Sequence, residues 1–205
     1  MNSIYEGFGE AAEYVLKHTV SEIEKYNNSV YVNTGHHIYE HLSYRIKTEE
    51  SMLAKCKRKG FEPNAYSALY RINDAVGVRI VTRFVNDVFS LVEYFRASPD
   101  FEVVREKDYI NNPKPNGYRS YHLILIVKAP FEDVNGNNPG SFYVEVQLRT
   151  IAMDMWASLE HEMKYKQTVP NKAVVESELK RCADELASCD ITMQTIKDLI
   201  RTEDI

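Results

Sequence analysis

Long hydrophobic runs are absent from this chain. Its 205 residues contain no stretch of 18 apolar residues, so the sequence predicts no membrane-spanning helix. The first residues, MNSIYEGFGEAAEYVLKH, lack the basic start and apolar centre of a secretory signal. We therefore expect a cytoplasmic protein that does not bind a membrane.

Cysteine is scarce, with three residues in all. Cys182 and Cys189 stand seven positions apart in a helical pattern, which is about 10 Å along a helix axis and too far for a disulfide. Cys56 lies among lysines, but a buried or incidental thiol is the simpler interpretation. The sequence predicts neither a disulfide framework nor a redox centre.

An excess of positive charge is also missing, because the net charge is −5. This balance argues against a protein that coats nucleic acid non-specifically. The basic residues are nevertheless clustered, since six of them fall between Arg45 and Lys59, against only Glu49 and Glu50. A local cationic site in an acidic chain is expected of a protein that binds a small polyanion.

The apolar periodicity predicts helices and strands around one central sheet. Helical spacing occurs in residues 1–26, in 48–59, after an Asn86 cap, from 151 and again after Pro170. Strand patterns occur in residues 75–84, 101–109, 118–127 and 142–149. An Asn-Gly turn signal at Asn135 joins the last two strands as an antiparallel hairpin. The predicted class is α+β, or mixed α/β.

A single domain over residues 1–205 accounts for the chain, with an N-terminal helical extension (1–30), a catalytic core (40–168) and a C-terminal helix (171–205). Apolar residues recur in the last helix at spacings of four and three: Val175, Leu179, Cys182, Leu186, Cys189, Met193, Ile196 and Ile200. Such a seam packs on the chain's own body or on another copy. A similar stripe at the N-terminus favours subunit contact, so we expect a homo-oligomer.

The strand in SFYVEVQLRT presents two different faces. Phe142, Val144, Val146 and Leu148 share one face, while Tyr143, Glu145, Gln147 and Arg149 share the other. A carboxylate, an amide and a guanidinium are costly to bury without partners. Taken alone, the strand also fits a polar face that is exposed to solvent.

Asp74 stands at the start of another predicted strand. Two carboxylates that enter a sheet from separate strands, here Asp74 and Glu145, are what a Mg²⁺ site needs, since the ion takes one or two carboxylates plus substrate phosphates. Arg45, Lys47 and Lys55 supply the complementary charge for phosphoryl transfer. An ordinary solvated basic helix stays open as an alternative for that segment.

The loop in NNPKPNGYRSYH is stiffened by two prolines. It carries Lys114 and Asn116 and is followed by Tyr118 and His122. A tyrosine ring can stack on a base, and the other side chains can donate to base edges or phosphates. The combination indicates a loop that can bind a nucleotide.

Four motifs resemble the synthetase domain of the RelA/SpoT family in order and spacing. They are RIKTEES from Arg45, DAVGVRI from Asp74, PKPNGYRSYH from Pro113 and EVQLRT from Glu145. MDMWASLEHEMKYK follows, so the resemblance to small single-domain alarmone synthetases covers nearly the whole chain. Tyr44 replaces a glycine common in the family. The His-Asp dipeptide of the long bifunctional members does not occur, so we expect synthesis without hydrolysis.

The resemblance implies a nucleotidyltransferase-like central mixed sheet flanked by helices. It implies a Mg²⁺-dependent transfer of pyrophosphate from ATP to the 3′-hydroxyl of GDP or GTP, which makes the stringent-response alarmones (p)ppGpp and leaves AMP. Arg45 and Arg79 would flank the adenine. The ATP phosphates would be held by Lys47, Ser51 and Lys55.

The remaining roles also follow from the resemblance. Asp74 would bind Mg²⁺, and Glu145 would join the metal or orient and deprotonate the attacking hydroxyl. Tyr118 would stack on guanine; the other acceptor-side residues would be Lys114, Asn116, His122, Gln147 and Arg149. The resemblance to small synthetases of this kind also implies a homotetramer built through terminal helices. Some members are activated by (p)ppGpp in a central cleft.

Two other functions stay open. A toxin-like relative would place pyrophosphate on the 3′ end of tRNA, with the KCKRK cluster at 55–59 as its basic track. A non-catalytic nucleotide- or RNA-binding module would share the fold. The acidic balance favours a nucleotide acceptor over RNA, and the presence of both Asp74 and Glu145 favours catalysis.

Overall fold

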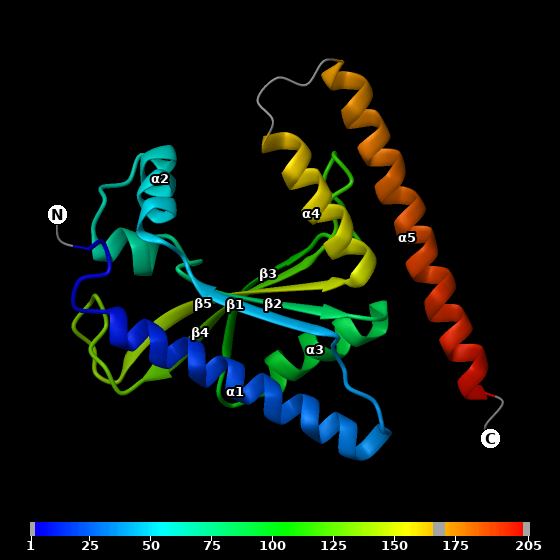
Figure 1. Ribbon diagram of the computed structural model, residues 1–205. Helices are drawn as coiled ribbons and strands as arrows, with labels where there is room; N and C mark the ends of the chain where they lie inside the picture. Colours follow the sequence, from blue (N-terminus) through cyan, green and yellow to red (C-terminus); the bar gives the residue numbers. More distant parts are fainter. Residues whose placement is uncertain (1–2, 166–170, 203–205) are drawn as a thin grey trace.

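The computed structural model describes residues 3–165 and 171–202 and contains a five-stranded mixed sheet with helices on both faces (Figure 1). The elements in chain order are α1 (Gly9–Thr34), β1 (His41–Ile46), α2 (Glu49–Lys59), the π-helical turn η1 (Ser67–Arg71), β2 (Val76–Thr82), α3 (Val85–Ala97), β3 (Glu102–Asp108), β4 (Tyr121–Ala129), β5 (Gly140–Thr150), α4 (Ile151–Tyr165) and α5 (Lys172–Thr202). The predicted mixed α/β class is confirmed. Within these residues, no helix has the length and apolarity to cross a membrane.

The strand order is β1-β2-β5-β4-β3. β2 and β5 run parallel, while the other neighbouring pairs are antiparallel, including the predicted β4–β5 hairpin. The register places Arg45 beside Gly77 and Gly77 beside Glu145. Residues two apart share a face. The next row on that face consists of Ser43, Arg79, Gln147 and His122.

The apolar face of the sheet forms the main core. It is covered by α1 and α3, which lie below the sheet in Figure 1. The four apolar residues predicted for one face of β5 are all buried: Phe142, Val144, Val146 and Leu148. Val15 and Phe95 from the two helices are fully buried against them. Each such side chain contributes roughly 1.5–3 kcal/mol relative to exposure, so this core directs the polar face of β5 to the opposite side.

Helix α2 begins and ends where the sequence predicts. The Thr48 side chain caps it by accepting from the Ser51 backbone N–H at 3.3 Å, and Gly60 ends it at φ 67°. Met52 and Cys56 are buried beneath the helix. The lysines and arginine of its last turn complement the partial negative charge of the helix C-terminus.

Helix α1 continues to Thr34, so the predicted end after residue 26 is wrong. Asn27 does not break the helix because its side chain is satisfied by the returning chain: Oδ1 accepts from the Ile38 N–H at 3.0 Å. The helix ends instead at Gly35, which has φ 74° and donates to the Tyr31 carbonyl.

Helix α3 begins at Val85, so the predicted Asn86 cap is also wrong. Phe84 stands at the cap and makes no side-chain cap bond. The backbone N–H of Asn86 is satisfied by Gln194 Oε1 of α5 at 3.1 Å. A distant helix thus supplies what a local capping side chain would have supplied.

Two strand boundaries also differ from the prediction. The extended segment that carries Arg45 forms the edge strand β1, which the periodicity does not reveal because most of its side chains are exposed. β4 begins at Tyr121 rather than at Tyr118. The three residues before it stay in the preceding loop.

Helix α5 packs along α4 and the start of α3. The predicted apolar seam is divided. Leu179 and Leu186 cluster with Ala183 of the same helix and Trp156 of α4, whereas five members are exposed, namely Cys182, Cys189, Met193, Ile196 and Ile200. The break predicted at Pro170 lies outside the described residues.

Candidate active site

A cavity of about 350 Å³, called the first cavity below, lies on the polar face of the sheet. It is lined by Ser43, Tyr44, Arg45, Lys47, Asp74, Gly77, Val78, Arg79, Glu145 and Gln147. The strand register explains this set, because Arg45, Gly77 and Glu145 form one row across three strands. Gly77 has no side chain, so the floor stays open between the guanidinium and the carboxylate.

A second cavity of about 180 Å³ adjoins the first and shares Asp74 and Glu145 with it. Lys55 and His122 also line it. Four further cations complete the wall: Lys59, which belongs to the basic cluster at 55–59, and Arg71, Arg105 and Lys107, which are absent from the sequence prediction. The alternation of Arg105 and Lys107 along β3 was the available signal, and the register places Lys107 beside His122. The two carboxylates therefore lie where two polar cavities meet.

Asp74 ends the turn before β2 and binds two cations through one oxygen. Its Oδ2 lies 2.5 Å from Lys47 Nζ and also pairs with Lys55 Nζ. Burial raises the pKa of Asp74, but the hydrogen bonds from the two lysines outweigh burial and hold the pKa below its usual value. Oδ1 is buried and has no partner among the described residues. An ionised carboxylate with a free buried oxygen fits a hard cation such as Mg²⁺.

Glu145 is also held as an anion. Its Oε2 accepts from Gln147 Nε2 at 3.0 Å, and its Oε1 lies 3.5 Å from His122 Nδ1. Burial raises the pKa of Glu145, but the His122 and Gln147 contacts outweigh burial and lower it. The carboxylate is available as a proton acceptor or a metal ligand.

A hydrogen-bond chain continues from His122 towards α4. His122 Nε2 lies 2.8 Å from the Tyr118 hydroxyl, which accepts from an Arg149 N–H at 3.0 Å. Arg149 donates in turn to Asp154 Oδ1 at 2.8 Å. The predicted acceptor residues Tyr118, His122 and Arg149 are thus joined to Glu145.

Asp154 is a site residue that the sequence reasoning missed. The same Oδ1 that accepts from Arg149 lies 3.4 Å from an Arg79 nitrogen. Asp154 stands in the first turn of α4, directly after β5. Its position five residues after Arg149 was the only sequence signal, and spacing alone does not reveal a residue that holds two arginines.

The other predicted residues line neither cavity. Lys114 lies over the Tyr118 ring, with Nζ 4.4 Å from the ring centroid. Asn116 donates to Glu160 Oε1 of α4 at 2.9 Å. Ser51 is exposed at the start of α2 and bonds to Thr48. The structure therefore brings ten of the thirteen predicted side chains together around the two carboxylates, through the cavity walls and the hydrogen-bond chain.

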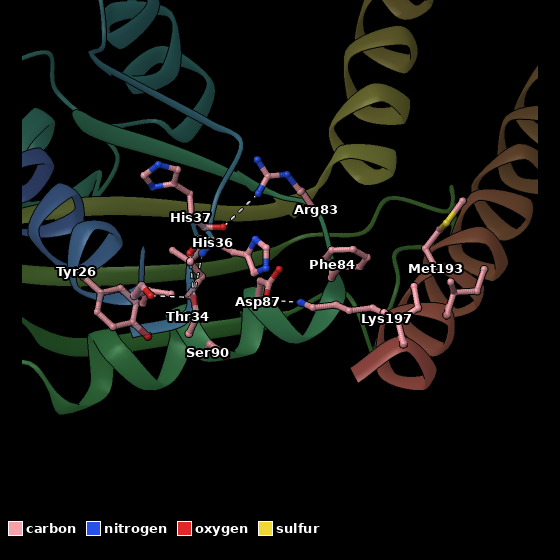
Figure 2. A pocket seen from close by; sticks show the side chains of 15 residues that line it. Tyr26, Thr34, His36, His37, Arg83, Phe84, Asp87, Ser90, Met193 and Lys197 are labelled. Atoms are coloured by element: carbon pink, nitrogen blue, oxygen red, sulfur yellow. Dashed lines mark hydrogen bonds and ion pairs between the residues drawn. The ribbon is translucent and has the colours of Figure 1, made fainter. Parts of the chain in front are cut away.

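A third and larger cavity, of about 800 Å³, lies away from this site (Figure 2). It is bounded by the end of α1, the start of α3 and the C-terminal half of α5. Phe84 and Met193 belong to its apolar wall, and Lys197 reaches from α5 to Asp87, at 3.0 Å. None of the predicted site residues lines it, so its greater volume does not make it the active site.

Two ionised carboxylates between cation-lined cavities, on the polar face of a mixed sheet, are the arrangement that phosphoryl transfer requires. The family model described as "Region found in RelA / SpoT proteins" matches residues 44–169. The chain belongs to the RelA/SpoT family, as its motifs indicate.

The relatives agree with this assignment. The chain is 41% identical to the GTP pyrophosphokinase YwaC of Bacillus subtilis over 164 residues, which cover 80% of this chain and 76% of the relative. A solved GTP pyrophosphokinase family protein from Streptococcus pneumoniae matches with a TM-score of 0.84 and 26% identity, over 99% of this chain and 97% of that one. The small alarmone synthetase 1 of B. subtilis, bound to its product pppGpp, matches with a TM-score of 0.81 and 30% identity, over 96% and 98%.

Proposed function

We propose that this chain is a guanosine alarmone synthetase, a GTP diphosphokinase. It transfers the β,γ-pyrophosphate of ATP to the 3′-hydroxyl of GDP or GTP and releases AMP. The proposal rests on one observation: Asp74 and Glu145 both line two adjoining cavities whose walls carry cations. The names of the relatives at 41% and 35% identity support the same reaction.

The first cavity is assigned to ATP. Arg45 and Arg79 lie on its wall, where their planar guanidinium groups can stack on an adenine. Lys47 and Lys55 converge on Asp74 and would neutralise the phosphates. Ser51, at the start of α2, would add a hydroxyl donor to the same phosphates.

The second cavity is assigned to the phosphates of the acceptor, because its walls carry an excess of positive charge. Tyr118 would stack on the guanine, with Lys114 and Asn116 contacting the acceptor nucleotide. Gln147 and Arg149 shape the wall between the two nucleotides.

Mg²⁺ would be held by Asp74 and Glu145 and would supply charge neutralisation for the transferred group. Asp74 Oδ1 is the buried oxygen left without a protein partner in the described residues. Glu145 orients the 3′-hydroxyl and takes its proton as the oxygen attacks the β-phosphorus of ATP. The bond between the β-phosphorus and the oxygen that bridges it to the α-phosphorus breaks, and AMP leaves with that oxygen.

Product analysis by anion exchange tests the reaction, the acceptor and the leaving group together. We expect the purified protein with ATP, Mg²⁺ and GDP or GTP to yield AMP and a 3′-pyrophosphorylated guanosine nucleotide. Glu145→Gln, which removes one charge at constant shape, is the control. AMP release no greater than in that variant would reject the proposal. Labelled pyrophosphate on tRNA instead of on the nucleotide would assign the toxin-like reaction.

We expect the chain to assemble through α5, and the family resemblance favours a tetramer that could hold (p)ppGpp between subunits. Ile196 and Ile200 are exposed on α5, whereas Leu186 contributes to the chain's own packing. Ile196→Glu combined with Ile200→Glu should therefore lower the mass in light scattering without unfolding the protein. Ser177→Glu, at an exposed polar position of the same helix, is the control. An unchanged mass would argue against assembly through this stripe.

A further inference from the structure

The β3–β4 loop, residues 109–120, lies directly against helix α5. Gly117 has φ 92°, and a Cβ atom built there would lie only 2.6 Å from the Cβ of Ala183 and 3.4 Å from the Cα of Lys180. Side-chain carbons do not approach one another that closely. Gly117 is therefore required both by its backbone conformation and by the closeness of the loop to the helix.

Arg119 joins the same two segments by hydrogen bonds. One terminal nitrogen donates to the Ala183 carbonyl at 3.2 Å and to the Gly117 carbonyl at 3.3 Å, and the other donates to Asp184 Oδ1 at 3.0 Å. The Arg119 side chain is 16% exposed. It lines neither of the two active-site cavities, so its role is to hold the loop.

Tyr118 stands between these two loop residues and packs against the same helix. Its ring packs with Trp156, Ala183 and Leu179 in one small cluster. Trp156 Nε1 donates to the Leu179 carbonyl of α5 at 2.8 Å, and the Trp156 and Tyr118 ring centroids are 6.4 Å apart. The position of α5 thus determines where the ring of Tyr118 lies on the proposed acceptor side.

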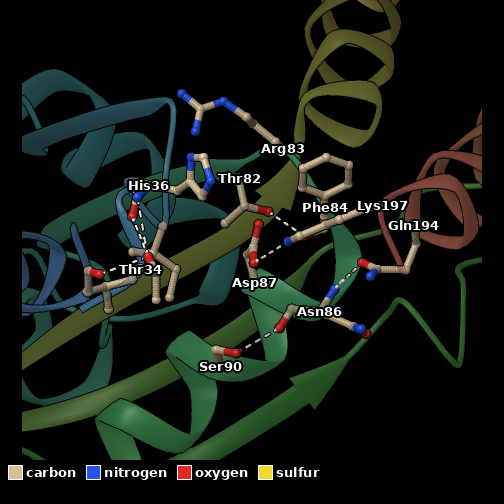
Figure 3. Close-up of polar contacts among 12 residues, drawn as sticks. Thr34, His36, Thr82, Arg83, Phe84, Asn86, Asp87, Ser90, Gln194 and Lys197 are labelled. Carbon is tan, nitrogen blue, oxygen red and sulfur yellow. Dashed lines mark hydrogen bonds and ion pairs between the residues drawn. The ribbon is translucent and has the colours of Figure 1, made fainter. Parts of the chain in front are cut away.

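Helix α5 is itself fixed to the rest of the molecule beyond the loop. Thr150 at the end of β5 donates to the buried Asp190 at 2.6 Å. Further along the helix, Gln194 accepts from the Asn86 N–H at 3.1 Å, and Lys197 pairs with Asp87 at 3.0 Å (Figure 3). The helix therefore offers Arg119 an anchored partner rather than a free end.

We propose that Arg119 is a positioning residue for the acceptor nucleotide: by joining the β3–β4 loop to α5, it fixes the ring and hydroxyl of Tyr118 at the acceptor side of the site. The inference rests on the proposed function for the identity of the acceptor. Donor binding depends on β1, β2 and α2, which Arg119 does not contact through any hydrogen bond of the described residues.

The test compares Arg119→Met with Arg181→Met. Arg181 lies on the exposed side of α5 and pairs only with Glu178 and Glu185 among the described residues, so the same substitution there changes the helix surface and not the loop. We expect Arg119→Met to raise KM for GDP and GTP by roughly tenfold or more, with KM for ATP within twofold of the wild type. Arg181→Met should change neither constant.

Binding without turnover provides a second readout. Trp156 is the single tryptophan of the chain and contacts both Tyr118 and α5, so its fluorescence reports on the loop. GDP titration should show the same roughly tenfold weakening in Arg119→Met, and calorimetry with a non-hydrolysable ATP analogue should show none. Arg119→Lys, which retains one donor group, should restore part of the affinity for GDP.

The outcomes separate the two proposals. Unchanged GDP affinity in a folded Arg119→Met variant, or equal losses for GDP and the ATP analogue, would overturn the positioning role alone. A wild-type protein that binds the ATP analogue but no guanosine nucleotide would overturn the proposed function, and this inference with it. If circular dichroism shows that Arg119→Met does not fold, Asp184→Asn removes the same charged bond from an exposed position and should shift GDP affinity in the same direction.

Discussion

The proposed donor side and the proposed acceptor side of the site are built in different ways. On the donor side, Arg45, Arg79 and Glu145 are placed by the hydrogen-bond register of three adjacent strands. On the acceptor side, Tyr118 stands on a loop that is held through Gly117 and Arg119 against helix α5. A sheet register cannot shift gradually, whereas a loop can follow the helix that supports it. We therefore expect donor binding to be robust and acceptor binding to be adjustable.

The largest effect is expected on the donor side, from Asp74→Asn. This change removes the charge that holds Lys47 and Lys55 and replaces one of the two carboxylate oxygens by an amide nitrogen, which cannot bind a metal. AMP release should fall by about two to three orders of magnitude. Asp100→Asn, an exposed carboxylate in the turn after α3, is the matched control. Activity within tenfold of the wild type would mean that Asp74 does not carry the metal.

The same variant has a pH-dependent consequence for stability. The pKa of Asp74 is lowered in the folded chain, so the ionised group stabilises the fold above its unfolded pKa of about 3.9, and this contribution is lost as the pH falls further. Denaturant unfolding should show wild type more stable than Asp74→Asn by about 2 kcal/mol at pH 7. The gap should narrow as the pH falls below about 3.9. A gap that stays constant over this range would contradict the assignment.

On the acceptor side, Gly117→Ala should disturb the loop without touching a nucleotide. Its backbone has φ 92° and its new Cβ would collide with Ala183. Gly136→Ala is the control, since Gly136 has φ 81° but nothing within 4 Å of its Cβ. Both changes incur about 1 kcal/mol for the left-handed backbone. Only Gly117→Ala should also raise KM for the acceptor; equal KM values in the two variants would show that the close approach has no functional role.

The smallest effect is expected from Tyr5→Phe. The Tyr5 hydroxyl donates to the Lys47 carbonyl at 2.9 Å, which connects the N-terminal segment to the donor lysine. Burial raises the pKa of Tyr5 to about 12, so the hydroxyl keeps its proton at neutral pH. Losing this bond, worth about 1 kcal/mol, should raise KM for ATP several-fold and leave the acceptor KM unchanged. Tyr31→Phe, at an exposed position of α1, should change neither.

The sequence predicts the parts of the site that depend on local pattern. Alternation along β5 places Glu145 and Gln147 on the polar face, and the cap at Thr48 sets the start of α2. The motif resemblance assigns the roles, and the structure gathers most of those residues.

The sequence does not reveal contacts between elements that are distant along the chain. Asp154 joins two arginines from neighbouring strands. Gln194, which is 108 residues away along the chain, accepts the Asn86 backbone N–H at the start of α3. Arg105 and Lys107 enter the site only because β3 pairs with β4. These features depend on three-dimensional packing, which the spacing of residues along the chain does not predict.

The shared carboxylate of Asp154 has a thermodynamic consequence. It pairs at once with Arg79, on the proposed ATP side, and with Arg149, on the proposed acceptor side. An ATP that drew Arg79 away would leave Asp154 to Arg149 alone and would thereby change the free energy of acceptor binding. Linkage makes that coupling reciprocal: whatever factor ATP contributes to acceptor affinity, the acceptor returns to ATP. In the proposed reaction, this one side chain would couple the binding of the two substrates before they react.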